Sequence, residues 1–98
     1  MTAALHITRA DYPDRGSYVA TLPGVAGIAR LAYRRERRDL LVAERTEVSE
    51  SLRPHGAGTA LAQRMVDDAR TEGVKIYFMC PYLNAERRKH PEWEDVLV

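Results

Sequence analysis

Cysteine is nearly absent from this chain of 98 residues, since Cys80 is the single one. One thiol excludes an internal disulfide framework and any metal site built from several thiolates. It fits a reducing compartment, so we expect a cytoplasmic protein. No apolar run approaches the roughly 18 residues that a membrane-spanning helix needs, and residues 1–10 carry neither a basic leader nor a long apolar stretch. The sequence therefore predicts no membrane span and no signal peptide.

A charge excess of one sign is also missing. Fifteen Lys and Arg against fourteen Asp and Glu give a formal net charge of +1, whereas nucleic-acid-binding domains usually carry a basic surplus. Nucleic acid is therefore not the expected partner. A local basic cluster does occur at Arg34, Arg35, Arg37 and Arg38, interrupted by Glu36. We interpret this cluster either as a solvated hairpin turn or as a surface for a phosphate or an acidic partner.

Metal-ligand spacing is not found either, because His6, His55 and His90 lie too far apart to suggest a ligand set. We predict no metal. A chain that is 45% hydrophobic and 30% charged is typical of a folded domain, and its length allows only one, over residues 1–98. At this size the hydrophobic core is thin. A thin core together with Trp93 makes a homodimer reasonable.

The first half of the chain is typical of strands, because short apolar runs are separated by turn residues. Leu5 and Ile7 indicate a short strand, and a turn is expected over Asp11–Gly16. The further predicted strands are Ser17–Leu22, Val25–Tyr33 and Asp39–Val48, and a charged turn over Arg34–Arg38 separates the last two.

The second half changes to helical spacing. A helix is predicted over Thr59–Glu72, with Gly73 placed to end it. A strand over Val74–Phe78 follows, and then a short helix that Asn84 caps and that runs through Lys89. A strand, a helix and a strand in this order form a right-handed βαβ unit. The expected fold is a mixed α/β sheet with antiparallel N-terminal strands, this βαβ unit and a short C-terminal helix.

The segment between the last predicted strand of the first half and the long helix contains two glycines, Gly56 and Gly58. The start of a helix presents unpaired N–H groups and partial positive charge, and glycines there let a ligand come close to the backbone. This pattern indicates an anion site, most often for phosphate, and Arg53 adds a cation. A plain turn explains the same glycines equally well. Neither the P-loop pattern nor the dinucleotide fingerprint is present, because no lysine follows and Leu61 stands at the third glycine position.

The stretch Arg53-Pro54-His55-Gly56-Ala57-Gly58 is of the form Arg-x-x-Gly-x-Gly and resembles the acetyl-CoA pyrophosphate loop of the GCN5-related N-acetyltransferases. Four further stretches extend the resemblance toward the small single-domain, YjdJ-like branch of that superfamily. They are Thr46-Glu47-Val48, Asp67-Asp68-Ala69-Arg70 with Gly73, Cys80-Pro81-Tyr82, and His90-Pro91-Glu92. The match runs from about Gly27 to Val98. Full-size members carry extra N-terminal helices that shape the acceptor pocket, and we expect strands, not such helices, over the first half of this sequence.

The resemblance implies acetyl-CoA as cosubstrate and an amine acceptor that the sequence does not name. Backbone groups of Thr46, Glu47 and Val48 would meet the pantetheine amides. The amides of His55, Gly56, Ala57, Gly58 and Thr59 would hold the pyrophosphate, beside Arg53. The acetyl thioester would end near Cys80 and Tyr82.

Three residues are candidates for the chemistry. Cys80 is either a thiol beside the thioester or a small buried hydrophobe. Glu47 is either the base that deprotonates the acceptor amine or a strand-end residue that faces water. Tyr82 either protonates the departing thiolate or packs as an ordinary aromatic. Two alternative functions stay open: a CoA or acyl-CoA binding module without turnover, and an interaction protein that uses the Arg34–Arg38 cluster.

Overall fold

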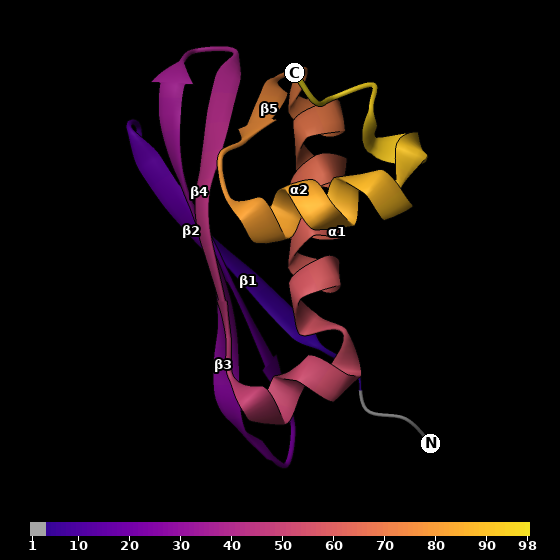
Figure 1. Cartoon of the computed structure of the whole chain (residues 1–98). Coiled ribbons are helices and arrows are strands. Elements are labelled where there is room, and N and C mark those ends of the chain that lie inside the picture. The colour runs from indigo at the N-terminus through magenta and orange to yellow at the C-terminus, as the bar shows by residue number, and fades with distance from the viewer. Residues whose placement is uncertain (1–3) are drawn as a thin grey trace.

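The computed structural model describes residues 4–98 and contains one five-stranded sheet whose strands follow one another in chain order (Figure 1). The expectation of no signal peptide falls partly on residues 1–3, which lie outside the described residues. Strands β1 to β4 pair antiparallel, and β5 pairs parallel with β4. Their bounds are β1 His6–Asp11, β2 Arg15–Leu22, β3 Val25–Arg37, β4 Leu40–Val48 and β5 Lys75–Phe78. The mixed α/β fold predicted from the sequence is confirmed.

The helical elements pack on one face of this sheet (Figure 1). A 3-10 helix η1 (Glu50–His55) leads from β4 into α1 (Ala57–Glu72), the crossover to β5. After β5 come α2 (Pro81–Lys89) and a single turn η2 (Pro91–Trp93). Among residues 4–98, no helix has both the length and the apolar character needed to cross a bilayer.

The periodicity of α1 explains its packing. Residues three and four apart lie on the same face of a helix, and the apolar ones here form one stripe against the sheet. The buried members of that stripe are Leu61, Ala62, Met65, Val66 and Ala69. Gly73 takes a left-handed conformation with φ 72° and ends the helix, as its position predicted.

Trp93 anchors the core between the helices and is fully buried. Its ring meets Phe78 edge-on, with centroids 6.3 Å apart, and stacks under His90 at 4.1 Å. The indole Nε1 donates a hydrogen bond of 2.9 Å to Oε1 of Gln63 on α1. The C-terminal turn is thereby held to both β5 and α1.

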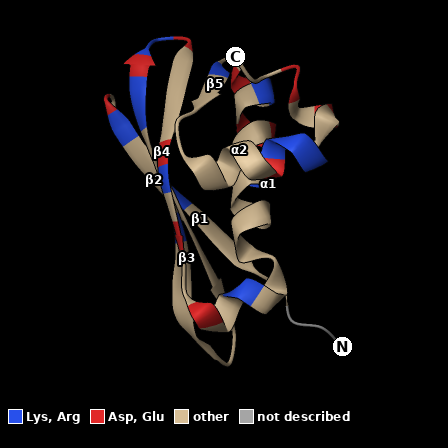
Figure 2. Ribbon diagram, viewed as in Figure 1, with Lys and Arg blue, Asp and Glu red and all other residues tan. Residues whose placement is uncertain are grey.

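Two expected turns are shorter than predicted. The turn over Asp11–Gly16 is reduced to three residues, because β1 extends to Asp11 and β2 begins at Arg15. The turn over Arg34–Arg38 is wrong for most of its length, since β3 continues through Arg37. Many charged residues lie at the β3–β4 hairpin, which is at the end of the sheet opposite to η1 (Figure 2). A strand accommodates these arginines because Arg34 pairs with Glu44 on β4 and Arg35 pairs with Asp11 on β1.

The helix ends also differ from the expectation. Helix α1 begins at Ala57, not Thr59, because Gly56 supplies the left-handed conformation that starts it. Asn84 does not cap α2, which begins at Pro81 with Cys80 as its N-cap residue. Proline suits the first helical position, where no N–H is required. Asn84 lies inside the helix, and its Nδ2 donates a hydrogen bond of 2.8 Å to the carbonyl of Phe78.

Candidate functional site

The parallel pair β4–β5 is joined for only part of the length of β4. The two strands are in register from Leu40 to Ala43, and the last bond between them runs from the N–H of Met79 to the carbonyl of Ala43. On its other side, the pairing of β4 with β3 has a register shift at the same point, because Ala32 pairs with Arg45 and Tyr33 pairs with Ala43. Beyond it, the edge of β4 over residues 44–48 has no strand partner on the β5 side among residues 4–98. An extended ligand can add to such an edge through backbone hydrogen bonds.

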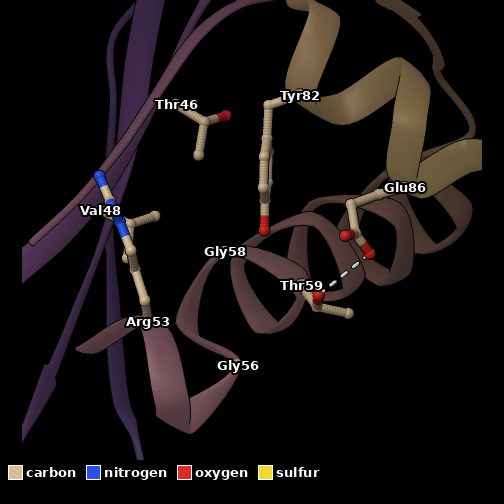
Figure 3. A pocket seen from close by; sticks show the side chains of 8 residues that line it. All are labelled: Thr46, Val48, Arg53, Gly56, Gly58, Thr59, Tyr82 and Glu86. Carbon is tan, nitrogen blue, oxygen red and sulfur yellow. Dashed lines mark hydrogen bonds between the residues drawn. The ribbon is translucent and has the colours of Figure 1, made fainter. Parts of the chain in front are cut away.

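A groove of about 490 Å³ opens between this free edge, the start of α1 and the first turns of α2 (Figure 3). It is lined by Thr46, Val48, Arg53, Gly56, Gly58, Thr59, Tyr82 and Glu86. Six of the eight residues predicted to bind the cofactor line it, together with Tyr82. The other two, His55 and Ala57, belong to the same turn, with His55 exposed and Ala57 buried.

The start of α1 leaves backbone donors free. Gly56 has φ 67°, its carbonyl accepts from Ala60, and its own N–H reaches only Arg53 at 3.3 Å. Among residues 4–98, the N–H groups of Ala57, Gly58 and Thr59 have no hydrogen-bond acceptor, and no side chain caps the helix. The first turn contains no acidic residue. Three unpaired donors and the positive end of the helix dipole make this turn attractive to an anion.

Arg53 strengthens the positive character of this end of the groove. Its side chain is exposed and extends along the wall toward Val48 (Figure 3). Within residues 4–98 it takes part in no ion pair, so its charge is available to a ligand.

Tyr82 reaches from α2 down into the groove and its hydroxyl lies against Gly58 (Figure 3). A Cβ at position 58 would overlap the phenol oxygen and ring carbon. Burial raises the pKa of the Tyr82 phenol above its ordinary value of 10.0, and the hydroxyl is protonated at neutral pH in either case. A neutral phenol can donate a hydrogen bond or a proton to a negatively charged sulfur.

Thr46 presents an unsatisfied polar atom to the same groove. Its Oγ1 is shielded from solvent and has no hydrogen-bond partner among the described residues 4–98. Unpaired buried polar atoms are rare, because each costs roughly 1–3 kcal/mol. A ligand that supplied a donor or an acceptor here would remove that cost.

Cys80 and Glu47 lie outside the lining of the groove. Cys80 is 7% exposed and packs into the hydrophobic core at the start of α2. Glu47 is exposed, pairs with Arg45 through an Nε–Oε1 distance of 3.1 Å, and lines a smaller hollow with Ile28 and Arg30. Side chains alternate along β4, so Glu47 faces the side of the sheet opposite to Thr46 and Val48.

Glu86 is the residue of the groove that sequence reasoning missed. It is the only buried charged residue of the described chain, 9% exposed, and its Oε2 accepts a hydrogen bond of 3.1 Å from Thr59 Oγ1 (Figure 3). Its position four residues after Tyr82 puts both on one face of α2. That spacing was the available signal, but it becomes informative only when Tyr82 is known to face the groove.

Three of the four arginines in the cluster at the β3–β4 hairpin form ion pairs with nearby carboxylates. Arg34 pairs with Glu36 and Glu44, Arg35 with Asp11, and Arg37 with Asp39. These contacts do not favour a free basic surface at this hairpin. Within residues 4–98, no group of three or more His, Cys, Asp or Glu side chains is arranged to hold a metal ion.

The strand order, the splayed β4–β5 pair and the open first turn of α1 define a mixed acetyltransferase-like α/β fold. A GCN5-like protein from Staphylococcus aureus, solved by NMR, shares this fold with a TM-score of 0.73. The alignment covers 96% of this chain and 88% of that one at 22% identity. The family model of the GCN5-related N-acetyltransferases matches residues 17–96, and the chain belongs to this family. No curated protein matches the chain. Membership supports an acetyltransferase function in general.

Proposed function

We propose that this chain is an acetyl-CoA-dependent N-acetyltransferase that passes the acetyl group directly to an amine. The observation that carries the proposal is the meeting of two features in one groove: the free edge of β4 and the three unpaired amides at the start of α1. CoA has a diphosphate at one end and amide groups along its arm, so it complements both features.

The pantetheine arm would lie along β4 as an additional strand does. Backbone groups of Thr46, Glu47 and Val48 would bond to its amides, and Thr46 Oγ1, now without a partner, would gain one. The diphosphate would sit at the turn from His55 to Thr59, where the free amides and the helix dipole favour negative charge. Arg53 would add a charge-assisted contact.

The transfer itself needs no covalent intermediate on the protein. The acceptor nitrogen attacks the thioester carbonyl carbon, a C–N bond forms, and the C–S bond breaks as the thiolate leaves. Free N–H groups of β4 would polarise the carbonyl as negative charge develops on its oxygen. The Tyr82 hydroxyl would protonate the thiolate, and the proton lost by the amine would pass to a base or to water.

Glu47 and Cys80 would have different roles, Glu47 as a base and Cys80 as a packing residue. As the base, Glu47 would serve an acceptor that approaches the sheet from the face opposite to the groove. Cys80 would stand near the thioester but behind the lining of the groove, within the hydrophobic core. Its burial supports packing more than nucleophilic attack.

A specific observation favours the second candidate function, a CoA or acyl-CoA binding module without turnover. The lining of the groove contains Tyr82 and Glu86 as titratable groups beside Arg53, and Glu86 is already bonded to Thr59. No other carboxylate or imidazole lines the groove within the described residues. Such a lining binds a cofactor but offers little help in deprotonating an amine.

One pair of measurements separates these functions. Thermal unfolding with CoA and acetyl-CoA should show stabilisation of about 2.7 kcal/mol when the ligand is at 100 times its dissociation constant. Release of free thiol from acetyl-CoA with a panel of amines should then identify turnover. Stabilisation without thiol release would establish the binding module. If neither cofactor stabilises the chain and duplex DNA binds in a salt-sensitive manner, the results would instead support an interaction protein that uses the Arg34–Arg38 cluster.

A further inference from the structure

Glu86 places negative charge in the part of the groove that the proposed function assigns to the diphosphate. Its carboxylate bonds to Thr59, whose own amide is one of the three free donors at the start of α1 (Figure 3). The side chain is 11% exposed, so solvent screens its charge less than it would on the surface. An arriving phosphate would therefore meet a carboxylate beside its donors.

The groups around Glu86 offset this charge only in part. From α2, Lys89 Nζ lies 3.7 Å from Oε1, but the lysine side chain is 71% exposed. At the end of α2, His90 Nε2 lies 3.7 Å from Oε2, while its Nδ1 contacts Glu92 at 2.9 Å. From α1, Thr59 supplies a neutral hydroxyl. Tyr82, on the same face of α2, is an uncharged phenol whose pKa burial raises further, so it does not offset the charge. No arginine pairs with Glu86 in the described chain.

We propose that Glu86 is a specificity residue that weakens the hold of the groove on the diphosphate and leaves the pantetheine contacts along β4 unaffected. Like charges brought together at a partly desolvated site reduce affinity. The Glu86–Thr59 bond also engages a hydroxyl that would otherwise be free to contact phosphate. The consequence is a groove that recognises CoA mainly through its arm and releases the diphosphate readily. This inference rests on the proposed function.

The test is calorimetric titration of the full chain with CoA and with pantetheine, which lacks the diphosphate. Glu86→Gln keeps the shape and a hydrogen-bond acceptor for Thr59 but removes the charge. We expect the variant to bind CoA about fivefold more tightly or better, and pantetheine with a Kd within about twofold of the wild type. The matched control Thr59→Val removes the bond and keeps the charge, and it should not tighten CoA binding.

Lys89→Gln gives an independent measurement, because this exposed side chain is tolerant of substitution. Loss of the lysine leaves Glu86 less neutralised, so CoA binding should weaken about twofold to threefold in the wild type and stay unchanged in the Glu86→Gln background. If Glu86→Gln fails to fold by circular dichroism, Lys89→Gln in the otherwise wild-type chain still tests the inference, because unchanged CoA binding by this single variant would contradict it.

Three further results would overturn the inference. They are equal or weaker CoA binding by Glu86→Gln, equal tightening of pantetheine and CoA, and a Lys89→Gln effect that persists without Glu86. If the wild type and all variants bind neither ligand, the proposed function fails and the inference fails with it. Equal CoA binding by the wild type and Glu86→Gln leaves the proposed function intact and removes the inference alone.

Discussion

The hydroxyl of Tyr82 lies against the α-carbon of Gly58, so that helices α1 and α2 touch at a point where no side chain fits on α1. Gly58 is thus required by helix packing, whatever ligand the groove binds. Gly56 differs, because no atom of residues 4–98 lies within 4 Å of where its Cβ would stand and its φ is 67°. Glycine is therefore favoured at the two positions for different reasons: close packing at Gly58 and a left-handed backbone at Gly56.

Gly58→Ala should lower the free energy of unfolding by about 1–3 kcal/mol, because the new methyl group overlaps Tyr82. Alanine by itself would favour a helix by up to about 1 kcal/mol, so a net loss identifies the overlap. Urea unfolding measures the change, and adding Tyr82→Ala should remove most of it. Gly56→Ala is the control: left-handed strain costs about 1–2 kcal/mol there, and Tyr82→Ala should not relieve it. Independent effects at Gly58 and Tyr82 would contradict this packing account.

Gly56→Asp should abolish CoA binding while the fold survives. Aspartate tolerates a positive φ better than most residues do, and position 56 has open space around it. Its carboxylate, however, would compete for the free amides of the next three residues and repel phosphate. Calorimetric titration with CoA and a thermal melt of the variant measure the two effects. Wild-type affinity in a folded Gly56→Asp protein would remove the loop from the proposed site.

The protonation of Tyr33 should make the free energy of unfolding depend on pH in the alkaline range. Burial, followed by the hydrogen bond to Asp11, raises its pKa from the ordinary value of 10.0 to about 12. The folded state therefore holds this proton more tightly than the unfolded state, so its contribution is complete below pH 10 and is lost as pH rises toward 12. Tyr33→Phe should make the loss of stability between these values shallower. It should also cost about 1 kcal/mol at neutral pH, because Arg9 and Asp11 lose a partner. Parallel pH profiles of the two proteins in urea unfolding would contradict the linkage.

Cys80→Ala and Tyr82→Phe should separate packing from chemistry. The buried thiol makes Cys80→Ala a loss of packing, so we expect near wild-type transfer and a stability loss of about 1 kcal/mol. Tyr82→Phe keeps the ring against Gly58 but removes the proton donor, and it should lower the rate of thiol release about tenfold to a hundredfold. Steady-state assays with acetyl-CoA measure both rates. Loss of transfer in Cys80→Ala with an intact fold would instead assign the thiol a chemical role.

Local periodicity was sufficient to predict most of the fold. The apolar stripe of α1 and the alternation of β5 are properties of neighbouring residues, and both elements lie within two residues of their predicted bounds at each end. The hairpin at Arg34–Arg37 was misjudged because consecutive charges usually mean a turn. Here Arg34 and Arg35 reach carboxylates of other strands, which no local pattern can reveal.

In the candidate site, too, contiguous features could be predicted from the sequence, whereas contacts between distant residues could not. The Arg-x-x-Gly-x-Gly loop predicted where the free amides would lie, because a loop and the helix it opens are contiguous. The partnership of Glu86 with Thr59 joins residues 27 positions apart and depends on how α2 crosses α1. From the sequence alone, Gly58 could be explained by the close approach of a ligand to the backbone. The structure gives another reason, because the Tyr82 ring occupies the space of a Cβ at position 58. The parts that sequence could not predict are those set by tertiary placement of α2.

The agreement between strand order in the sheet and order along the chain has a kinetic consequence. Strands β2, β3 and β4 each pair with the preceding strand through a short turn, so this meander closes only small loops and should assemble early. Strand β5 joins only after the whole of α1 has crossed over. We expect the transition state to lack the groove, in which case a cofactor would slow unfolding in chevron experiments and leave the refolding rate unchanged.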